Sequence, residues 1–370
     1  MSQARNFADL LASGTTITTD KIVNDGRLGN KNLIINGAFQ IWQRGNGATT
    51  VSGNDIFAAD RFKGWANGGG TYTVEQSTDV PNNEFEFSAK LTNTATDGSV
   101  AAGDFYAYAT DIEGYNVSQL AYGHSDAKAV TLSFWVKSSL AGTYCIALYS
   151  TTANRSHIKE YTISSANTWE KKTITISSGD TTGSWNRTNG NGLRIYWDLG
   201  SGSTYQASAD TWLASQDFST TNQAAWIGSA SATFYITGIQ LEEGETATDF
   251  EHKSYGDELA KCQRYYVQLV NGNSQSISIG SALGSGANQA RAVVQFPVEM
   301  RASPSVVSNS GTQYFTIEGI ISFDGPMLTT YKNTRAAMVY FSTGTTLTTG
   351  QSGVFRSNNA SASLAFKAEL

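Results

Sequence analysis

The chain has 370 residues, a formal net charge of -6 and only 15% charged residues. This balance argues against a nucleic-acid partner, because neutralising phosphates needs clustered Lys and Arg. Gly is abundant at 36 residues and Pro is scarce at 4, a composition typical of strands joined by tight turns. The length predicts two globular units, since domains usually have roughly 100 to 200 residues.

The N-terminal region differs from the rest of the chain. No apolar run reaches the roughly 20 residues of a membrane helix, and the start, MSQARNFADLLASG, lacks the basic and apolar regions of a signal peptide. We therefore expect a soluble chain made in a cytoplasm, without membrane insertion, whose Cys145 and Cys262 are reduced, buried thiols.

Residues 1–31 cannot bury a core alone. They are expected to form an arm that docks into something larger, and a frayed terminus is the alternative.

A pattern of short strands begins at Asn32 with NLIINGAFQIWQRG. Alternating side chains, bounded by Gly, Asn and Asp, predict strands over residues 60–65, 71–76, 85–91, 105–112, 129–139, 144–149, 157–163, 169–176, 193–199 and 233–241. About ten short strands without a helical period are typical of an all-β, antiparallel jelly roll or β-sandwich. We assign residues 32–250 to this domain.

One convincing helix follows. In SYGDELAKCQRYY, residues 254–266, acidic residues come early and basic ones late, in the order that the helix dipole favours. We interpret residues 251–266 as a helical hinge and residues 267–370 as a second, smaller β-sandwich domain. Strands are predicted there over residues 276–279, 290–296, 314–321, 336–342 and 363–369.

The segment 129–139, AVTLSFWVKSS, is predicted to be the central strand of a sheet. Its apolar residues share one face, while Trp135 and Lys137 lie among Thr and Ser on the other. The segment 193–199 has an outward face of similar character. If the two strands are neighbours in one sheet, their outward faces form a single patch.

Saccharide recognition needs flat aromatic faces together with polar groups for the hydroxyls. The candidate carbohydrate-binding residues are Trp135, Tyr196, Arg194 and Asp198, followed by Lys137 and Tyr149. The alternative is structural, because sandwiches of this kind also bury outward aromatic residues under loops or against sister chains.

Six motifs occur in an order that resembles a recurrent protein of tailed bacteriophages, a tail-fibre or other receptor-binding virion protein. The motifs are NLIINGAFQIWQRG, DIEGYNVSQLAYG, AVTLSFWVKSS, NTWEKKTITI, FYITGIQLEEG and SYGDELAKCQRYY. The similarity covers roughly residues 32–266 and fades in the C-terminal domain, apart from QFPVEMRASPSV and FKAEL. Within it, residues 32–244 are similar to the carbohydrate-binding jelly rolls attached to bacterial glycoside hydrolases.

The resemblance implies a virion protein of the tail or fibre, assembled in the host cytoplasm. Residues 1–31 would attach it to other virion proteins, its ligand would be a host cell-surface glycan, and it would be a homotrimer. Jelly rolls of this kind often hold a structural calcium through acidic side chains near the opening Phe and in the closing strand. Here Gln40, Thr237 and Gly238 occupy those positions, which favours a module without a cofactor.

The sequence offers little for catalysis. It has no nucleophile elbow, P-loop or dinucleotide fingerprint, and its three histidines are scattered without metal-ligand spacing. The pairs Glu84 with Glu86 and Glu242 with Glu243 are too close in sequence for a glycosidase dyad, which needs two carboxyls facing each other across a cleft. We predict a virion protein that is not an enzyme and recognises a glycan. The alternatives are a spacer, collar or decoration subunit without a ligand, and a capsule depolymerase.

Overall fold

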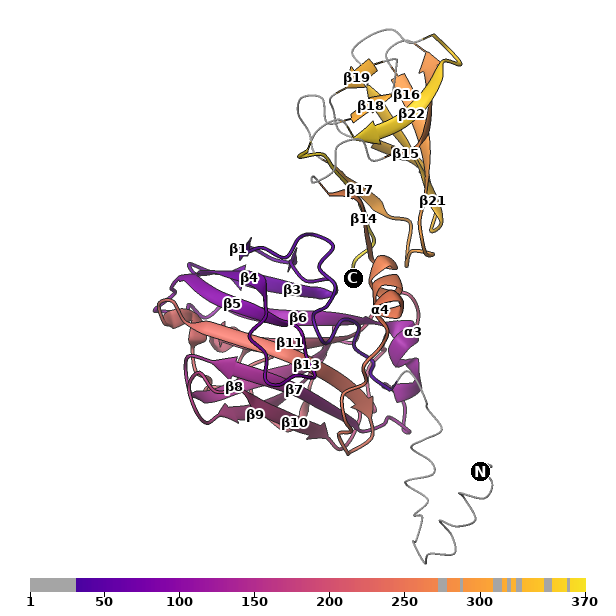
Figure 1. Ribbon diagram of the computed structural model, residues 1–370. Coiled ribbons are helices and arrows are strands. Elements are labelled where there is room, and N and C mark those ends of the chain that lie inside the picture. The colour runs from indigo at the N-terminus through magenta and orange to yellow at the C-terminus, as the bar shows by residue number, and fades with distance from the viewer. Residues whose placement is uncertain are drawn as a thin grey trace, which may run out of the picture.

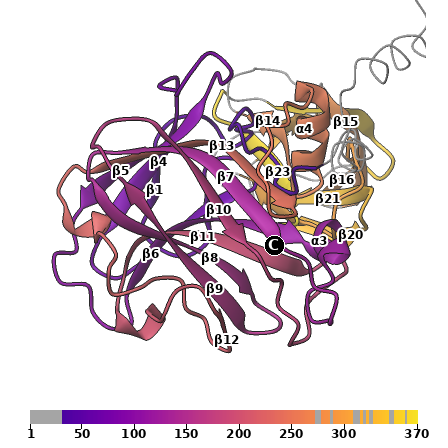
Figure 2. The same ribbon diagram turned by 90° about the horizontal axis from the view of Figure 1, so that it is seen from below.

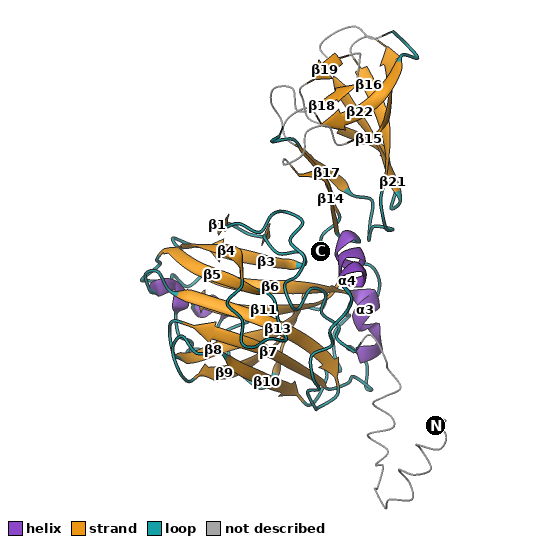
Figure 3. Cartoon of the chain, viewed as in Figure 1, coloured by secondary structure: helices purple, strands orange, loops and turns teal. Residues whose placement is uncertain are grey.

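The computed structural model describes residues 31–271, 278–286, 289–308, 315–317, 321–323, 328–342, 348–357 and 360–370. The chain forms two β-rich units that meet at helix α4 (Tyr255–Gln263), as Figure 1 shows. The predicted all-β, antiparallel fold class is confirmed, and Figure 3 shows how little of the chain is helical. The arm predicted for residues 1–31 lies outside the described residues, apart from Lys31.

Two antiparallel sheets build the first unit. The six-stranded sheet contains, in spatial order, β1 (Thr49–Val51), β4 (Thr71–Ser77), β5 (Ser88–Ala95), β13 (Thr233–Glu243), β7 (Val130–Ser138) and β10 (Glu170–Ile176). The seven-stranded sheet contains β12 (Trp212–Leu213), β9 (Arg155–Ile163), β8 (Gly142–Ser150), β11 (Asn191–Ser201), β6 (Phe105–Glu113), β3 (Phe62–Asn67) and β2 (Ile56–Phe57). The short helices α3 (Gly114–Val117), η2 (Ser118–Leu120), η3 (Ser203–Tyr205) and η4 (Trp226–Gly228) lie in the connections. Figure 2 shows the first unit from below, with its two sheets layered.

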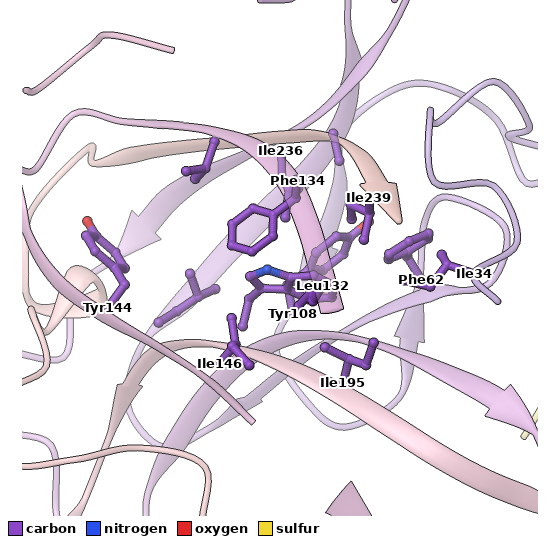
Figure 4. Close-up of a cluster of buried hydrophobic side chains, with 14 of the residues drawn as sticks. Ile34, Phe62, Tyr108, Leu132, Phe134, Tyr144, Ile146, Ile195, Ile236 and Ile239 are labelled. Atoms are coloured by element: carbon purple, nitrogen blue, oxygen red, sulfur yellow. The ribbon is translucent and has the colours of Figure 1, made fainter. Parts of the chain in front are cut away.

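The facing sides of the two sheets bury one apolar core, shown in Figure 4. The period-two alternation of β7 turns Leu132 and Phe134 inward. The ring of Trp197 on β11 meets Phe134 edge-on, with ring centroids 5.8 Å apart. Each such side chain, once buried, contributes roughly 1.5 to 3 kcal/mol. The same alternation turns the remaining residues of β7 outward, which is what makes an outer face available for a site.

The second unit also contains two sheets. A three-stranded sheet consists of β14 (Tyr266–Asn271), β23 (Ser363–Lys367) and β17 (Ser305–Ser308). A seven-stranded sheet consists of β19 (Ile321–Phe323), β18 (Phe315–Ile317), β22 (Ser352–Ser357), β15 (Ser278–Gly286), β16 (Gln289–Gln295), β21 (Ala336–Ser342) and β20 (Leu328–Lys332). The single strand predicted over residues 314–321 is wrong. Ile317 pairs with Ile321 in antiparallel β18 and β19, so the chain reverses between them.

The predicted helix over residues 254–266 is shorter in the structure. Ser254 is the N-cap, and its hydroxyl accepts a hydrogen bond from the Asp257 amide at 3.2 Å. The helix ends at Gln263, because Tyr266 already begins β14 and pairs with Lys367 of β23. Asp257 and Glu258 lie in the first turn and Lys261 in the last, as the dipole argument predicts, but Arg264 and Tyr265 form a turn after the helix and Tyr266 belongs to a strand.

Buried charges join the two units where the C-terminal strand ends. The side chain of Arg61, 2% exposed, forms an ion pair with Glu369 and donates a hydrogen bond to the Asp111 carbonyl oxygen at 2.6 Å. Its guanidinium also lies 3.5 Å from the ring centroid of Tyr265. Arg44 forms a second ion pair with Glu369 at 2.7 Å. A single carboxylate from the second unit thus balances two guanidinium groups of the first.

We expect the change Glu369→Ala to lower the free energy of unfolding by about 3 kcal/mol, because it leaves the Arg61 guanidinium buried without its partner. Urea denaturation measures this loss. The matched control is Glu299→Ala, whose partner is Arg335 in a pair with side chains 50% and 79% exposed. The control should leave the free energy of unfolding nearly unchanged, because water screens an exposed pair. Equal losses in the two variants would contradict a stabilising role for the buried junction.

Candidate functional site

The structure places the six predicted site residues on two different sheets. Trp135 and Lys137 lie on β7 of the six-stranded sheet, whereas Arg194, Tyr196 and Asp198 lie on β11 and Tyr149 lies on β8 of the seven-stranded sheet. Because the sheets pack face to face, their outer faces point in opposite directions. The condition for a single patch is not met, and that part of the prediction is wrong.

The outer face of β11 and β8 is covered by the chain itself. Tyr196 is 1% exposed and stacks on Phe218, with ring centroids 4.7 Å apart. Tyr149 is buried beside Tyr196, at a centroid distance of 6.1 Å. The segment 203–220 supplies Phe218 and packs with these rings into an apolar cluster outside the main core. The prediction of an open face here is wrong, because this segment occupies the place of a ligand.

The two charged residues of β11 are also engaged internally. Arg194 makes a bidentate ion pair with Asp111, at 2.5 and 3.0 Å. Asp198 accepts hydrogen bonds from the hydroxyls of Ser201 at 2.5 Å and Ser219 at 2.9 Å. Burial raises the pKa of Asp198 to about 7, although both hydrogen bonds act in the opposite direction. The Asp198–Ser219 hydrogen bond ties the covering segment to β11, and both charged side chains of β11 are engaged within the chain, Arg194 at 13% and Asp198 at 2% exposure.

The raised pKa of Asp198 predicts a pH dependence of stability. An unfolded aspartate ionises near pH 3.8 and the folded one near pH 7, so the folded state holds the extra proton between these values. Its stabilising contribution is complete below about pH 4 and is lost as the pH rises toward 7. Asp198→Asn removes this loss. The quantity to compare is the melting temperature of the variant minus that of wild type. We expect this difference to be larger at pH 8 than at pH 4, and calorimetry at both pH values measures it. A difference that does not change with pH would contradict the buried ionisation.

The outer face of the six-stranded sheet carries a different arrangement. Side chains from neighbouring strands form a line across it: Glu75 on β4, Lys90 on β5, Tyr235 on β13, Lys137 on β7 and Trp169, the residue before β10. Tyr235 pairs in register with both Lys90 and Lys137, and Lys90 pairs with Glu75. Residues directly opposite each other share a face of a sheet. We call these five residues the aromatic–lysine row.

Short contacts fix the geometry of the row. The ammonium group of Lys137 lies 4.3 Å from the ring centroid of Tyr235 and 5.3 Å from that of Trp169. The two rings meet edge-on at a centroid distance of 6.1 Å. At the other end, the ammonium group of Lys90 lies 2.7 Å from a carboxylate oxygen of Glu75. Cation–π contacts at partly exposed sites contribute about 0.5 to 1 kcal/mol each, so they orient the rings more than they stabilise the fold.

Asp79, from the loop after β4, closes one end of the row. Its carboxylate forms an ion pair with Lys137 and accepts a hydrogen bond from the Trp169 indole nitrogen at 2.9 Å. Burial acts to raise the pKa of Asp79, but the hydrogen bonds from Lys137 and Trp169 outweigh it and lower the pKa below its usual value. The carboxylate is therefore held ionised at the surface. Its exposed position leaves lone pairs for a ligand's hydroxyl groups.

Trp135 borders the row on the same face and is half-buried. The register of β13 shifts between Thr237 and Gln240, which marks a bulge opposite this ring. Gly238 lies in the bulge with φ of 61°, and a Cβ there would come within 3.2 Å of Trp135 and 2.7 Å of Phe85. Glycine is thus favoured here, because it adopts the positive φ and leaves room for the rings of Phe85 and Trp135.

The predicted residues Trp135 and Lys137 lie on this face, but Tyr235, Trp169 and Asp79 were missed. Tyr235 had a signal, since alternation within 233–241 turns it away from the apolar residues Phe234 and Ile236. Trp169 also had a signal, because it begins the predicted strand 169–176, in which alternation turns it away from Ile174 and Ile176, whereas Asp79 lies in a loop and has no periodic signal. Together, the row presents two aromatic edges among ammonium and carboxylate groups, a set that can stack on a pyranose and bond its hydroxyls.

Glu84, Glu242 and Glu243, weighed above as members of a dyad, each have partners within the chain. Glu242 is buried and accepts hydrogen bonds from Thr248, while Glu243 pairs with Lys128 at 2.7 Å. Glu84 accepts a hydrogen bond from Asn82 at the surface. Within the described ranges, no group of three or more His, Cys, Asp or Glu residues could hold a metal ion.

The residues at the expected calcium position do not fit that ion well. The Thr237 hydroxyl donates to the Phe87 carbonyl oxygen at 2.7 Å, and Gly238 has no side chain, so neither supplies a carboxylate.

Cys145 and Cys262 are buried and unbridged, as predicted. In the part of the chain that the structure describes, no helix is long and apolar enough to cross a membrane.

No family model and no curated protein matches the chain. Among solved structures, it is similar to the enzymatically active domain of bacteriophage CBA120 tailspike protein 4, with 14% identity and a TM-score of 0.32, covering 58% of this chain and 22% of that chain. It is also similar to the family 11 carbohydrate-binding module of Clostridium thermocellum in complex with a β-1,3-1,4-mixed-linked tetrasaccharide. The identity is 12% and the TM-score 0.30, and the match covers 56% of this chain and 99% of the module. A xylan-binding CBM22-1 domain from Paenibacillus barcinonensis has 11% identity and a TM-score of 0.27, and the match covers 55% of this chain and 97% of that domain. Similarity at this level assigns no ligand.

Proposed function

We propose that this protein is a glycan-binding subunit that is not an enzyme, and that the aromatic–lysine row is its binding surface. The observation that carries the proposal is the alignment of Tyr235, Lys137 and Trp169 across adjacent strands, with Asp79 fixing the last two. Large aromatic side chains rarely stay partly exposed on a sheet face without a contact to make. Here their position is held by ion pairs and not by a covering loop.

The row suits an extended saccharide. Its groups come from five neighbouring strand positions, so they form a line across an outer face and do not surround a cavity. Such a surface stacks successive sugar rings on Trp169 and Tyr235 and offers charged groups to the hydroxyls between them. Because the side chains are already oriented by mutual contacts, less conformational entropy is lost on binding.

The biological setting that we propose is a bacteriophage virion, in which the protein belongs to a tail fibre or a similar appendage and meets a host-surface glycan. The resemblance of residues 32–266 to receptor-binding virion proteins supports this proposal. Residues 1–31 would attach the protein to the particle. Assembly as a homotrimer would link several weak sites and raise the overall affinity by 10²–10⁴-fold.

The row can be tested with two variants, Tyr235→Ala and Trp169→Ala. Each removes one ring, and central aromatic residues of a binding surface cost about 2 kcal/mol or more when truncated, roughly thirtyfold in affinity. We expect each variant to lose binding to host surface polysaccharide by that factor in calorimetry, and to lose competition with phage adsorption. Tyr235→Phe, which keeps the ring, should retain most of the binding.

The matched control is Tyr331→Ala, which removes a tyrosine 65% exposed on the second unit. It should leave binding unchanged, and thermal unfolding should show that all variants are folded. If the folded ring variants bind and compete like wild type, the row is not the binding surface. If wild type neither binds nor competes, the protein is a spacer, collar or decoration subunit and the proposal fails.

A further inference from the structure

A groove of about 380 Å³ lies on the first unit near its junction with the second, away from the row. Its walls are the opening segment at residues 32–35, the short helices α3 and η2, and α4. The volume is within the range of about 300 to 1,000 Å³ that is common for small-ligand sites. Residues of both α3 and α4, labelled in Figure 1, line the groove. Neither the predicted site nor the aromatic–lysine row includes it.

The lining of the groove contains three cationic side chains and no carboxylate. The cations are Lys253, Lys261 and Arg264. Arg264 is held by a bidentate ion pair with Glu113, at 2.7 and 2.9 Å, which aligns its guanidinium. The ammonium group of Lys253 donates to the Asn32 carbonyl oxygen at 3.2 Å and lies 3.5 Å from a carboxylate oxygen of Glu251. Both groups are therefore positioned before any ligand arrives.

Lys261 is the cation whose charge the groove stabilises least. Burial lowers its pKa, and the neighbouring Lys253 lowers it further, while Glu258 and Glu251 act in the opposite direction. An anion placed between the two ammonium groups would relieve this repulsion and favour the charged form of Lys261. A carboxylate is an organic anion that ammonium and guanidinium groups bind through short, charge-assisted hydrogen bonds.

The opposite wall carries neutral groups suited to a sugar ring. Tyr115 on α3 lines the groove and is 57% exposed, so its side chain is accessible to a ligand there. Asn116 and Gln119 add two side-chain amides, each able to donate to one hydroxyl and accept from another. An acidic monosaccharide needs more than cations for its carboxylate. Its ring carbons need an aromatic surface such as tyrosine, and its hydroxyls need polar groups such as amides.

We infer that this groove binds the carboxylate-bearing residue of an acidic saccharide, of the hexuronic or sialic acid type. The carboxylate lies between Lys253 and Lys261, and the pyranose ring lies against Tyr115. The site is separate from the aromatic–lysine row, so it stands whether or not the row binds glycan.

The test uses the full chain and isothermal titration calorimetry with glucuronate and N-acetylneuraminate. Glucose serves as the uncharged sugar and acetate as the bare carboxylate. We expect at least one acidic sugar to bind at least tenfold more tightly than glucose or acetate. Lys261→Gln and Tyr115→Ala should each weaken that binding at least tenfold, whereas Lys171→Gln, which removes an exposed lysine on β10, should not.

Each other outcome overturns the inference. Binding of acetate as tight as that of both acidic sugars would show that only a charge is recognised. Acidic-sugar binding that survives both groove variants, with the variants folded by thermal unfolding, would place it elsewhere. Absence of binding by both acidic sugars would exclude the site. The row variant Trp169→Ala separates the two sites, because it should leave acidic-sugar binding intact even though it removes polysaccharide binding at the row.

Discussion

The first unit depends on the insertion of its last strand, β13, between β5 and β7. This pairing joins residues far apart in the chain: Tyr235 is opposite both Lys90 and Lys137. The same strand also fastens the opening segment, since the Leu33 amide donates to the Leu241 carbonyl oxygen at 2.9 Å. Without β13, the six-stranded sheet would be two separate ribbons and the aromatic–lysine row would lose its centre. The proposed binding surface and the closure of the sandwich are thus consequences of one strand pairing.

Charged residues fall into two physical classes in this structure. Arg61, Glu369, Arg194 and Asp111 are desolvated and paired, so their partners cannot be exchanged for a ligand without a large penalty. The Lys137–Asp79 pair is open on its carboxylate side, because the Asp79 side chain is 46% exposed while that of Lys137 is only 11% exposed, so a sugar hydroxyl can replace a water at the carboxylate at little cost. The first class joins and covers parts of the fold. The second remains available, which is why we assign recognition to the six-stranded sheet.

Local pattern was enough to predict most strands, because period-two alternation is dictated by which faces are buried. The strands predicted over 105–112, 129–139 and 193–199 correspond to β6, β7 and β11 within a few residues. The site was harder. Trp135 and Tyr196 have the same alternation and similar neighbours in the sequence, yet one is half-buried beside the row and the other is sealed under Phe218. That difference arises from a covering segment more than ten residues away along the chain, which no strand pattern encodes.

Trp169 offers the most direct test that the outer face of the six-stranded sheet is the binding surface. Its indole N–H donates to Asp79, so a sugar bound at the row must alter the environment of that proton. The measurement is the shift of the indole N–H signals in NMR spectra during titration with host surface oligosaccharide. We predict that the Trp169 signal shifts in proportion to saturation, while those of the buried Trp197 and Trp226 stay constant. A saturable shift confined to Trp212, which lies on the seven-stranded sheet, or binding without any shift at Trp169, would contradict the account.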